Sequence, residues 1–308
     1  MARVVISEFM DERAVARLGA RHDVLFDPGL VDAAANLERA AARADALIVR
    51  NRTQVRGALV AALAPGAVIG RLGVGLDNID VEACAARGIT VIAATGANAL
   101  AVAEYVIGAA MLLLRGAYRS TAEVAAGGWP RQALGNGREI GAKTMGLVGF
   151  GSIGRHTARL AQAIGMRVVA TDAMLEPGDP AFVAGGVSPV GLDDLLATAD
   201  VVSLHVPLLE ATRGLINSAR IAAMKPGAVL VNTARGGIVD EAAVAAALRS
   251  GRLGGAALDV FAREPLAADH PFAGCPNLLL TPHIAGVTAE ANERVSFFIA
   301  DKVLEALG

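Results

Sequence analysis

The chain has 308 residues, of which 54% are hydrophobic and 19% charged, and its formal net charge is −2 with a pI of about 6.2. That length is about twice the usual single domain, so two domains are expected, and the scattered charge offers no footprint for nucleic acid or a membrane surface. The only cysteines, Cys84 and Cys275, lack metal-ligand or CxxC spacing, so no metal site and no disulfide framework are expected.

The first part of the chain alternates short apolar runs with alanine-rich segments long enough to form helices. Its opening, MARVVISEFMDER, reaches charged residues too soon for a signal peptide, so a cytoplasmic protein is expected. The alternation is typical of a parallel sheet covered on both faces. The strands are expected at residues 4–7, 23–26, 46–49, 67–70 and 89–92. Together these elements predict one doubly wound α/β unit.

A long helix is expected over residues 99–115, and a Gly- and Pro-rich stretch separates it from a second set of alternating elements. The apolar part of this helix, 99–114, contains Glu104 and is too short to span a bilayer comfortably, so it is expected to be a buried helix. The later strands are expected at residues 145–150, 166–172, 200–206, 228–234, 256–261 and 277–283. A second doubly wound unit follows from that series.

The last segment, from Thr288 onward, has the pattern of one amphipathic helix that returns to the first unit. The expected fold is therefore α/β, with two doubly wound parallel-sheet (Rossmann-like) domains of which one is discontinuous. We expect residues 1–97 with 286–308 to form a flavodoxin-like substrate domain. Residues 98–285 are expected to form the second domain, which carries the cofactor.

A glycine-rich turn, GFGSIG at 149–154, fits the G-x-G-x-x-G fingerprint of dinucleotide binding. The turn directly follows an expected strand, opens a helical pattern, and precedes a second strand that ends in Asp172, about the 20 residues further on that the fingerprint requires. Asp172 can accept hydrogen bonds from ribose hydroxyls, and its charge would repel a 2′-phosphate. Ala173 stands where an arginine would favour NADP, so the expected cofactor is NAD.

Each position of this turn has a physical role. Gly149 permits the tight turn, Gly151 lets the backbone approach a pyrophosphate, and Gly154 allows the helix to pack closely on the strand. The amides of Ser152 and Ile153 then face the phosphates at the positive end of the helix.

Ionisable residues stand at the ends of three later strands, where ligands collect in open α/β sheets. They are Arg235 in NTARGG, Asp259 and Glu264 in LDVFAREP, and His283 in LLLTPHIAG. Hydride transfer to a ketone leaves negative charge on oxygen, so the site needs a proton donor and a cation. His283 and Arg235 have those properties, and Glu264 is the expected carboxylate partner of His283.

Each of these residues also has a structural explanation. Arg235 can be a surface arginine, Glu264 a cap beside Pro265, and His283 a hydrogen-bonded histidine at a strand end. Their joint position downstream of a complete dinucleotide fingerprint favours catalysis instead. Among the other histidines, only His205 is expected near the cofactor.

Several longer motifs resemble the D-isomer-specific 2-hydroxyacid dehydrogenase family, and the resemblance covers essentially the whole chain. These motifs, besides the glycine turn, are GRLGVGLDNID (70–80), SLHVP (203–207), MKPGAVLVNTARG (224–236), NTARGGIVDE (232–241), LDVFAREP (258–265) and TPHIAG (281–286). The resemblance implies a small 2-hydroxy or 2-keto acid as substrate, Arg235 as its anchor, His283 as acid/base with Glu264 as partner, and a homodimer formed through the second domain.

The glycine turn, the residues at strand ends and the resemblance together give the residues expected around the ligands. Those expected at NAD are Gly149, Gly151, Ser152, Ile153, Gly154, Asp172, His205, Val206, Pro207, Thr233, Ala234, Arg235, Asp259, His283 and Gly286. Those expected at the substrate are Arg50, Arg52, Leu72, Gly73, Val74, Gly75, Arg235 and His283. Backbone amides of the Leu72 to Gly75 segment are implied to hold the substrate carboxylate.

The substrate itself is expected to carry a second anion. Within the family, ISEFMDE (6–12), LIVRNRTQV (47–55), WPRQAL (129–134) and HIAGVT (283–288) are similar to the branch that acts on (S)-sulfolactate, with enzymes of 3-phosphoglycerate next. Arg50 and Arg52 are two apart at a strand end, so both are expected to point to one face, where their forked donors suit sulfonate or phosphate oxygens. The alternative is a pair of solvated arginines.

Two other functions remain open from the sequence. A broad glyoxylate/hydroxypyruvate reductase would have no special use for Arg50 and Arg52. Some relatives of these enzymes instead act as NAD-sensing interaction proteins. Here the trio of Arg235, Glu264 and His283 is complete, which favours turnover.

Overall fold

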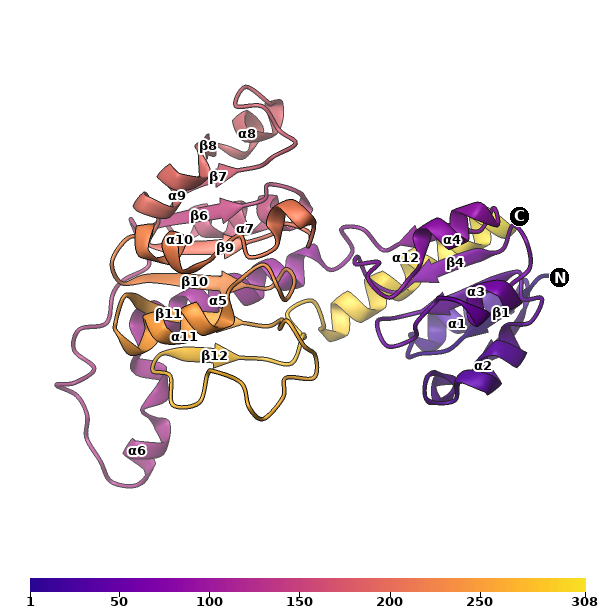
Figure 1. Ribbon diagram of the computed structural model, residues 1–308, viewed down its shortest axis with the longest axis horizontal. Coiled ribbons are helices and arrows are strands. Elements are labelled where there is room, and N and C mark those ends of the chain that lie inside the picture. The colour runs from indigo at the N-terminus through magenta and orange to yellow at the C-terminus, as the bar shows by residue number, and fades with distance from the viewer. The chain divides into compact units, whose positions relative to one another are not determined.

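The structure is a computed structural model that describes all residues from 1 to 308. The chain divides into two compact units. Unit 1 contains Met1–Asn98 and Val287–Gly308, and unit 2 contains Ala99–Gly286. Figure 1 shows the yellow C-terminal helix within the indigo elements of unit 1, so this unit is built from both ends of the chain.

Unit 1 is built on a parallel sheet of five strands in the order β2-β1-β3-β4-β5. Its strands are β1 (Arg3–Ile6), β2 (Asp23–Phe26), β3 (Ala46–Val49), β4 (Val68–Arg71) and β5 (Thr90–Ala93). Every residue of β3 is buried, as expected for a central strand covered on both faces.

Helices cover both faces of this sheet. They are α1 (Glu12–Gly19), α2 (Ala34–Ala41), α3 (Ala58–Ala62), α4 (Val81–Ala86) and α12 (Ala289–Leu307), with a short 3₁₀ helix, η1 (Pro28–Asp32). The side chain of Thr288 caps α12 by accepting the N–H of Ala291 at 3.0 Å. This helix lies so close to β4 that a Cβ atom at Gly70 would stand 2.7 Å from Ile299 Cγ2.

Unit 2 has a parallel sheet of seven strands in the order β12-β11-β10-β9-β6-β7-β8 (Figure 1). Its strands are β6 (Thr144–Val148), β7 (Arg167–Thr171), β8 (Ser188–Pro189), β9 (Val201–Leu204), β10 (Ala228–Asn232), β11 (Leu253–Leu258) and β12 (Leu278–Leu280). The strand order reverses between β6 and β9, and such a switch point is where open α/β sheets bind ligands.

The helices of unit 2 bury two hydrophobic clusters against the two faces of this sheet. They are α5 (Ala99–Arg115), α6 (Thr121–Ala125), α7 (Ser152–Ala163), α8 (Pro180–Gly185), α9 (Leu192–Thr198), α10 (Ser218–Ala223) and α11 (Glu241–Arg249), with 3₁₀ turns η2 (Ala117–Arg119) and η3 (Glu210–Thr212). No helix of the chain has the length and apolar character that crossing a bilayer requires.

The expected α/β class with two parallel sheets is confirmed, and the long helix spans the predicted residues 99–115. The strands of unit 2 were predicted to run too far toward their carboxyl ends, because the apolar pattern continues past the last paired residue. The strand predicted at 200–206, for example, ends at Leu204. The short edge strand β8 was missed, because two residues are too few for a periodic signal.

The close packing of α12 on β4 generates a stability prediction. Gly70→Ala should lower the free energy of unfolding by about 1–3 kcal/mol, because the new methyl group overpacks against Ile299 and Val303. Gly108→Ala is the control, since nothing lies within 4 Å of a Cβ atom there and the residue is in the middle of α5. This change should stabilise by about 0.5–1 kcal/mol. Urea unfolding measures both, and a stabilised Gly70→Ala protein would contradict the packing.

Candidate active site

The glycine turn joins β6 to α7 and is held by close backbone contacts. Gly149 has φ +98°, and a Cβ atom there would lie 2.6 Å from the carbonyl oxygen of His205. A Cβ atom at Gly154 would lie 2.4 Å from the carbonyl oxygen of Gly149. Only glycine fits at either position, so the first turn of α7 packs directly on the loop.

Gly151 differs from the two other glycines. Nothing lies within 4 Å of a Cβ atom at this position, so its outer side is open. Gly151 also precedes the first residue of α7 and provides no side-chain cap, which leaves the first amides of the helix, those of Ser152 and Ile153, without such a partner. An open approach to unpaired amides at a helix N-terminus is suited to binding phosphate.

Asp172 follows the last residue of β7 and faces the same turn. Its carboxylate accepts the N–H of Phe150 at 2.7 Å through Oδ2 and the N–H of Met174 at 2.9 Å through Oδ1. Each carboxylate oxygen keeps a lone pair, so Asp172 can still accept hydroxyl donors from a ligand. It also adds a negative charge beside the loop.

His205, Val206 and Pro207 follow β9, on the other side of the glycine turn. The N–H of His205 donates to the Val148 carbonyl at 2.7 Å, which holds this segment beside β6. The ring atom His205 Nε2 is buried without a hydrogen-bond partner. Burial lowers the pKa of His205 to about 4, so the ring is neutral at pH 7.

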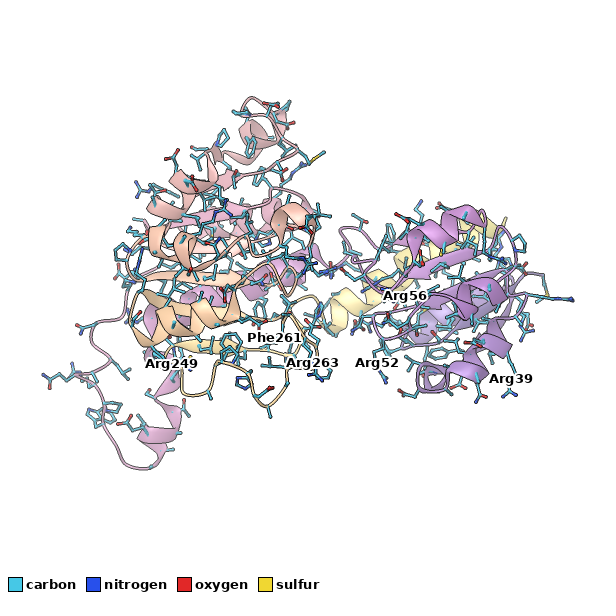
Figure 2. The ribbon with its side chains drawn as sticks, in the orientation of Figure 1. Arg39, Arg52, Arg56, Arg249, Phe261 and Arg263 are labelled. Atoms are coloured by element: carbon cyan, nitrogen blue, oxygen red, sulfur yellow. The ribbon has the colours of Figure 1, made fainter.

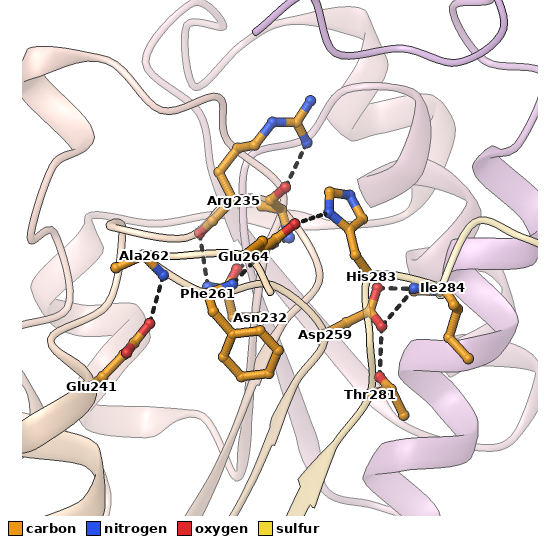
Figure 3. Close-up of polar contacts among 12 residues, drawn as sticks. Asn232, Arg235, Glu241, Asp259, Phe261, Ala262, Glu264, Thr281, His283 and Ile284 are labelled. Atoms are coloured by element: carbon orange, nitrogen blue, oxygen red, sulfur yellow. Dashed lines mark hydrogen bonds and ion pairs between the residues drawn. The ribbon is translucent and has the colours of Figure 1, made fainter. Parts of the chain in front are cut away.

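The parallel sheet brings the three predicted catalytic side chains together. Arg235 follows β10, Glu264 follows β11 and His283 follows β12, and these are neighbouring strands that end at the same edge. Glu264 Oε2 lies 2.7 Å from His283 Nδ1, and Figure 3 shows Arg235 above the same pair. The predicted partner of His283 is therefore within hydrogen-bonding distance.

Glu264 is held as a carboxylate. Partial burial alone would raise the pKa of Glu264. The hydrogen bond to His283 and a 3.0 Å hydrogen bond from the Phe261 N–H act in the opposite direction, as do the charges of His283 and Arg235. Together they lower the pKa of Glu264 below its ordinary value. An ionised Glu264 accepts from Nδ1–H of His283, which leaves Nε2 of the ring facing outward to exchange a proton.

Arg235 is oriented by its own turn. Asn232 Nδ2 donates to the Arg235 carbonyl at 3.0 Å and Asn232 Oδ1 accepts the Ala234 N–H at 3.1 Å, so the last residue of β10 shapes the loop. The guanidinium donates through Nη1 to the Ala234 carbonyl at 2.6 Å (Figure 3). The neighbouring residue, Thr233, has a buried hydroxyl without a partner.

Two residues that hold Glu264 in place were not singled out from the sequence. A Cβ atom at Gly236 would lie 1.8 Å from the Phe261 carbonyl oxygen, so this glycine lets the turn after β10 touch the backbone that leads to Glu264. Glu241 Oε1 accepts the Ala262 N–H at 2.7 Å (Figure 3). Both lie in NTARGGIVDE, so the motif contained the signal, but their partners are far along the chain.

Asp259, which was expected to line the nicotinamide, also holds the loop of His283. Its buried carboxylate accepts the N–H groups of Ile284 and Ala285, each at 2.8 Å. Its carbonyl accepts the His283 N–H at 2.8 Å. His283 has φ +56°, an unfavourable conformation for a residue with a side chain, and these bonds hold it there. Gly286, also expected at NAD, directly follows this loop and is the last residue of unit 2.

The segment Leu72 to Gly75 follows β4 in unit 1 and is only partly suited to the expected carboxylate binding. The Leu72 N–H donates to the Val49 carbonyl at 2.8 Å and the Gly73 N–H to the Arg71 carbonyl at 2.7 Å. These two amides are therefore already used within the protein, which corrects the expectation for them. The Val74 and Gly75 amides are the ones to which the proposal still applies.

Arg50 and Arg52 do not share a strand face as predicted, because β3 ends at Val49 and both residues lie in the turn beyond it. Their N–H groups donate to the buried Glu8 carboxylate at 2.8 and 3.2 Å. The Arg50 guanidinium donates to Asn292 Oδ1 at 2.8 Å, whereas that of Arg52 pairs with Asp32. Arg52 projects from the surface of unit 1 (Figure 2), so the two side chains have separate partners.

Comparison with known proteins identifies the family. A model described as the D-isomer specific 2-hydroxyacid dehydrogenase NAD binding domain matches residues 107–285. The chain belongs to this family. An (S)-sulfolactate dehydrogenase from Chromohalobacter salexigens is 54% identical over 308 residues, which cover 100% of this chain and 99% of that protein.

Other similar proteins are consistent with this family assignment. A D-3-phosphoglycerate dehydrogenase from Mycobacterium leprae is 39% identical over 304 residues, or 99% of this chain but 56% of that protein. A solved structure from Thermus thermophilus has a TM-score of 0.85 and 35% identity, covering 99% of this chain and 96% of that one. The chain is therefore an NAD-dependent oxidoreductase acting on CH–OH donors, and the relatives, named as dehydrogenases, do not support an NAD-sensing role.

The residues of unit 2 fit NAD. Gly151 leaves an open approach to the α7 amides, Asp172 provides acceptors one strand away, and the buried Thr233 hydroxyl and His205 Nε2 have no partner within the protein. Buried polar atoms without partners are costly, so a polar ligand that reaches them would be bound favourably.

The buried ring of His205 generates a pH prediction. Its pKa rises from about 4 in the folded protein to 6.5 on unfolding, so the unfolded state binds the extra proton between these values. Stability from this residue is complete above pH 6.5 and falls by up to about 3 kcal/mol as the pH drops to 4. His205→Gln should flatten this part of the melting-temperature profile relative to the unchanged protein. Parallel profiles for His205→Gln and the unchanged protein would contradict the prediction.

Proposed function

We propose that the chain oxidises (S)-sulfolactate to sulfopyruvate with NAD. The observation that carries this proposal is the 54% identity, over the whole of this chain, with a protein named (S)-sulfolactate dehydrogenase. The Glu264–His283 pair with Arg235 beside it supports the reaction class, because oxidation of a 2-hydroxy acid needs a proton acceptor and a cation together.

The chemistry is divided among three side chains. Arg235 binds the substrate carboxylate through its forked donors and sets the α-carbon in place. Nε2 of His283 removes the hydroxyl proton as the carbonyl forms, and it returns a proton to that oxygen when the reaction runs backward. NAD, which the glycine turn and Asp172 would hold, would supply the acceptor for the hydride that leaves the α-carbon.

Glu264 acts through His283. As a carboxylate it holds the Nδ1 proton of the ring, which fixes the tautomer with Nε2 free as the base. When His283 takes up the substrate proton, the positive ring lies 2.7 Å from a negative oxygen. This pairing stabilises the charged histidine that oxidation produces.

The second anion of the substrate is assigned to unit 1. Arg50 is the better candidate, because its guanidinium is half-buried over the Phe9 ring and donates to a neutral amide, Asn292. Arg52 already pairs with Asp32 and would have to exchange that partner for a sulfonate. Arg50 loses less on binding an anion, since its guanidinium hydrogen-bonds a neutral amide and forms no ion pair, whereas Arg52 is paired with Asp32.

The alternative substrate is D-3-phosphoglycerate, because the Mycobacterium leprae relative named D-3-phosphoglycerate dehydrogenase is 39% identical to this chain. Its phosphate would use the same arginines as a sulfonate. Glyoxylate and hydroxypyruvate carry no second anion, so a reductase of these acids would be indifferent to Arg50.

We also propose a homodimer in the cytoplasm. The family resemblance implies dimerisation through the second domain, and the exposed side chains of Val124 and Trp129 on one segment of unit 2 support it. Light scattering on the purified protein measures the mass of the particle, which should be twice that of one chain.

The function is tested by NADH formation with a panel of 2-hydroxy acids. The panel contains both enantiomers of sulfolactate, with 3-phosphoglycerate, malate, glycerate and lactate. We expect the highest kcat/KM for (S)-sulfolactate. A higher value for 3-phosphoglycerate would keep the reaction class and replace the substrate, and an absence of turnover on every acid would refute the proposal.

Arginine variants in the same assay test the anion site. Arg50→Ala should lower kcat/KM for sulfolactate about 10- to 100-fold relative to lactate, because a charged hydrogen bond is lost only with the dianion. Arg52→Ala should have a smaller effect of the same sign. Arg39→Ala is the control, since Arg39 projects from α2 and bonds Asn36 of the same helix (Figure 2). Equal losses on both substrates would contradict the assignment.

The Glu264 charge generates a prediction for keto-acid reduction, in which His283 gives up a proton. Glu264 stays ionised because its pKa is lowered, so a negative oxygen lies 2.7 Å from the ring. Glu264→Gln should lower the maximal rate about tenfold, because a neutral amide no longer pairs with the charged ring. The control is Glu305→Gln, an exposed partner of Lys302 in α12. An unchanged maximal rate with Glu264→Gln would remove Glu264 from this role.

A further inference from the structure

A chain of three hydrogen-bonding side chains leads from helix α5 to the loop that carries His283. The hydroxyl of Tyr105 lies 2.6 Å from Thr281 Oγ1, and Thr281 Oγ1 lies 2.6 Å from Asp259 Oδ1. Tyr105 stands in the second turn of α5, Thr281 directly follows β12, and Asp259 directly follows β11. All three residues belong to unit 2.

The chemistry of the groups gives this chain a direction. A threonine hydroxyl has one proton, and the Asp259 carboxylate can only accept. Thr281 therefore donates its proton to Asp259 and accepts the proton of Tyr105. The tyrosine thus orients the threonine toward the carboxylate.

The other contacts of Asp259 show what depends on this arrangement. Oδ1 accepts both Thr281 and the Ile284 N–H, while Oδ2 accepts the Ala285 N–H. The carboxylate is 1% exposed, so water does not replace a lost donor easily. These bonds clamp the residues on both sides of His283, whose φ of +56° would otherwise relax.

We propose that Tyr105 is a positioning residue for His283, acting through Thr281 and Asp259. The inference rests on the proposed role of His283 as the acid/base. Tyr105 itself donates a single hydrogen bond, to Thr281. Its effect on the reaction is to keep the His283 imidazole in the position that proton transfer requires. A displacement of the ring by a fraction of an ångström is enough to slow proton transfer.

Phenylalanine at position 105 tests this directly. Without the phenol, the Thr281 hydroxyl loses its donor and is free to rotate away from Asp259. Tyr105→Phe should lower kcat about three- to tenfold, the effect of roughly one lost hydrogen bond. The KM for substrate and the affinity for NAD, measured by calorimetry, should change less than about twofold, because Arg235 and the glycine turn are untouched.

The chain has two tyrosines, which provides the matched control and a second readout. Tyr118 is exposed, and Tyr118→Phe should leave kcat unchanged. Burial raises the pKa of Tyr105, only partly offset by its bond to Thr281. In an ultraviolet titration, Tyr105→Phe should remove the phenol whose pKa is raised by burial, which verifies its environment without any assay of turnover.

A double-mutant cycle with Thr281→Val decides whether the two residues act together. The double variant should be no slower than Thr281→Val alone, because Tyr105 has nothing left to orient. Losses that multiply would overturn the proposal, and so would wild-type kcat in Tyr105→Phe. His283→Ala separates the two hypotheses: if it is inactive while Tyr105→Phe is unimpaired, the proposed function stands and this inference fails. Turnover in His283→Ala would instead refute the acid/base assignment itself.

Discussion

A buried carboxylate that follows β11 organises the loop that carries His283. Asp259 accepts hydrogen bonds from the Thr281 hydroxyl and from the N–H groups of Ile284 and Ala285, and its carbonyl accepts that of His283. An ion buried this deeply is tolerated only when its oxygens are satisfied, so the loop and the carboxylate require each other. The result is a histidine in a left-handed conformation, directed toward Glu264.

The same sheet edge serves two purposes because all its strands are parallel. At the switch point, the turn after β6 and the segment after β9 touch through Gly149 and His205, which leaves the open side at Gly151 for a dinucleotide. Further along the same edge, the turns after β10, β11 and β12 hold the ionisable groups. The residues proposed for the cofactor and those proposed for proton transfer therefore lie on one edge, in different loops.

Local patterns predicted the elements whose signal is continuous along the chain. The helix over residues 99–115 was found to the residue, because a long apolar run has few alternatives. The Glu264–His283 pair was also predicted, since parallel strands must end together and each residue follows one of them. The hydrogen bonds of Asp259, by contrast, join a side chain to backbone amides about 25 residues away. No periodic pattern in the sequence predicts such a bond, so the role of Asp259 in holding the His283 loop was missed.

Arg50 and Arg52 show that the direction of side chains near a strand end is also difficult to predict from sequence spacing. A spacing of two implies a common face only while the backbone remains extended, and β3 ends one residue before Arg50. What bends the chain there is Glu8, a buried carboxylate that collects the N–H groups of Arg50, Arg52 and Thr53. The side chains then separate toward Asn292 and Asp32. Because Arg52 already has a carboxylate partner and Arg50 has a neutral one, the turn makes the two arginines unequal, which is why the proposed recognition of a second substrate anion is assigned mainly to Arg50.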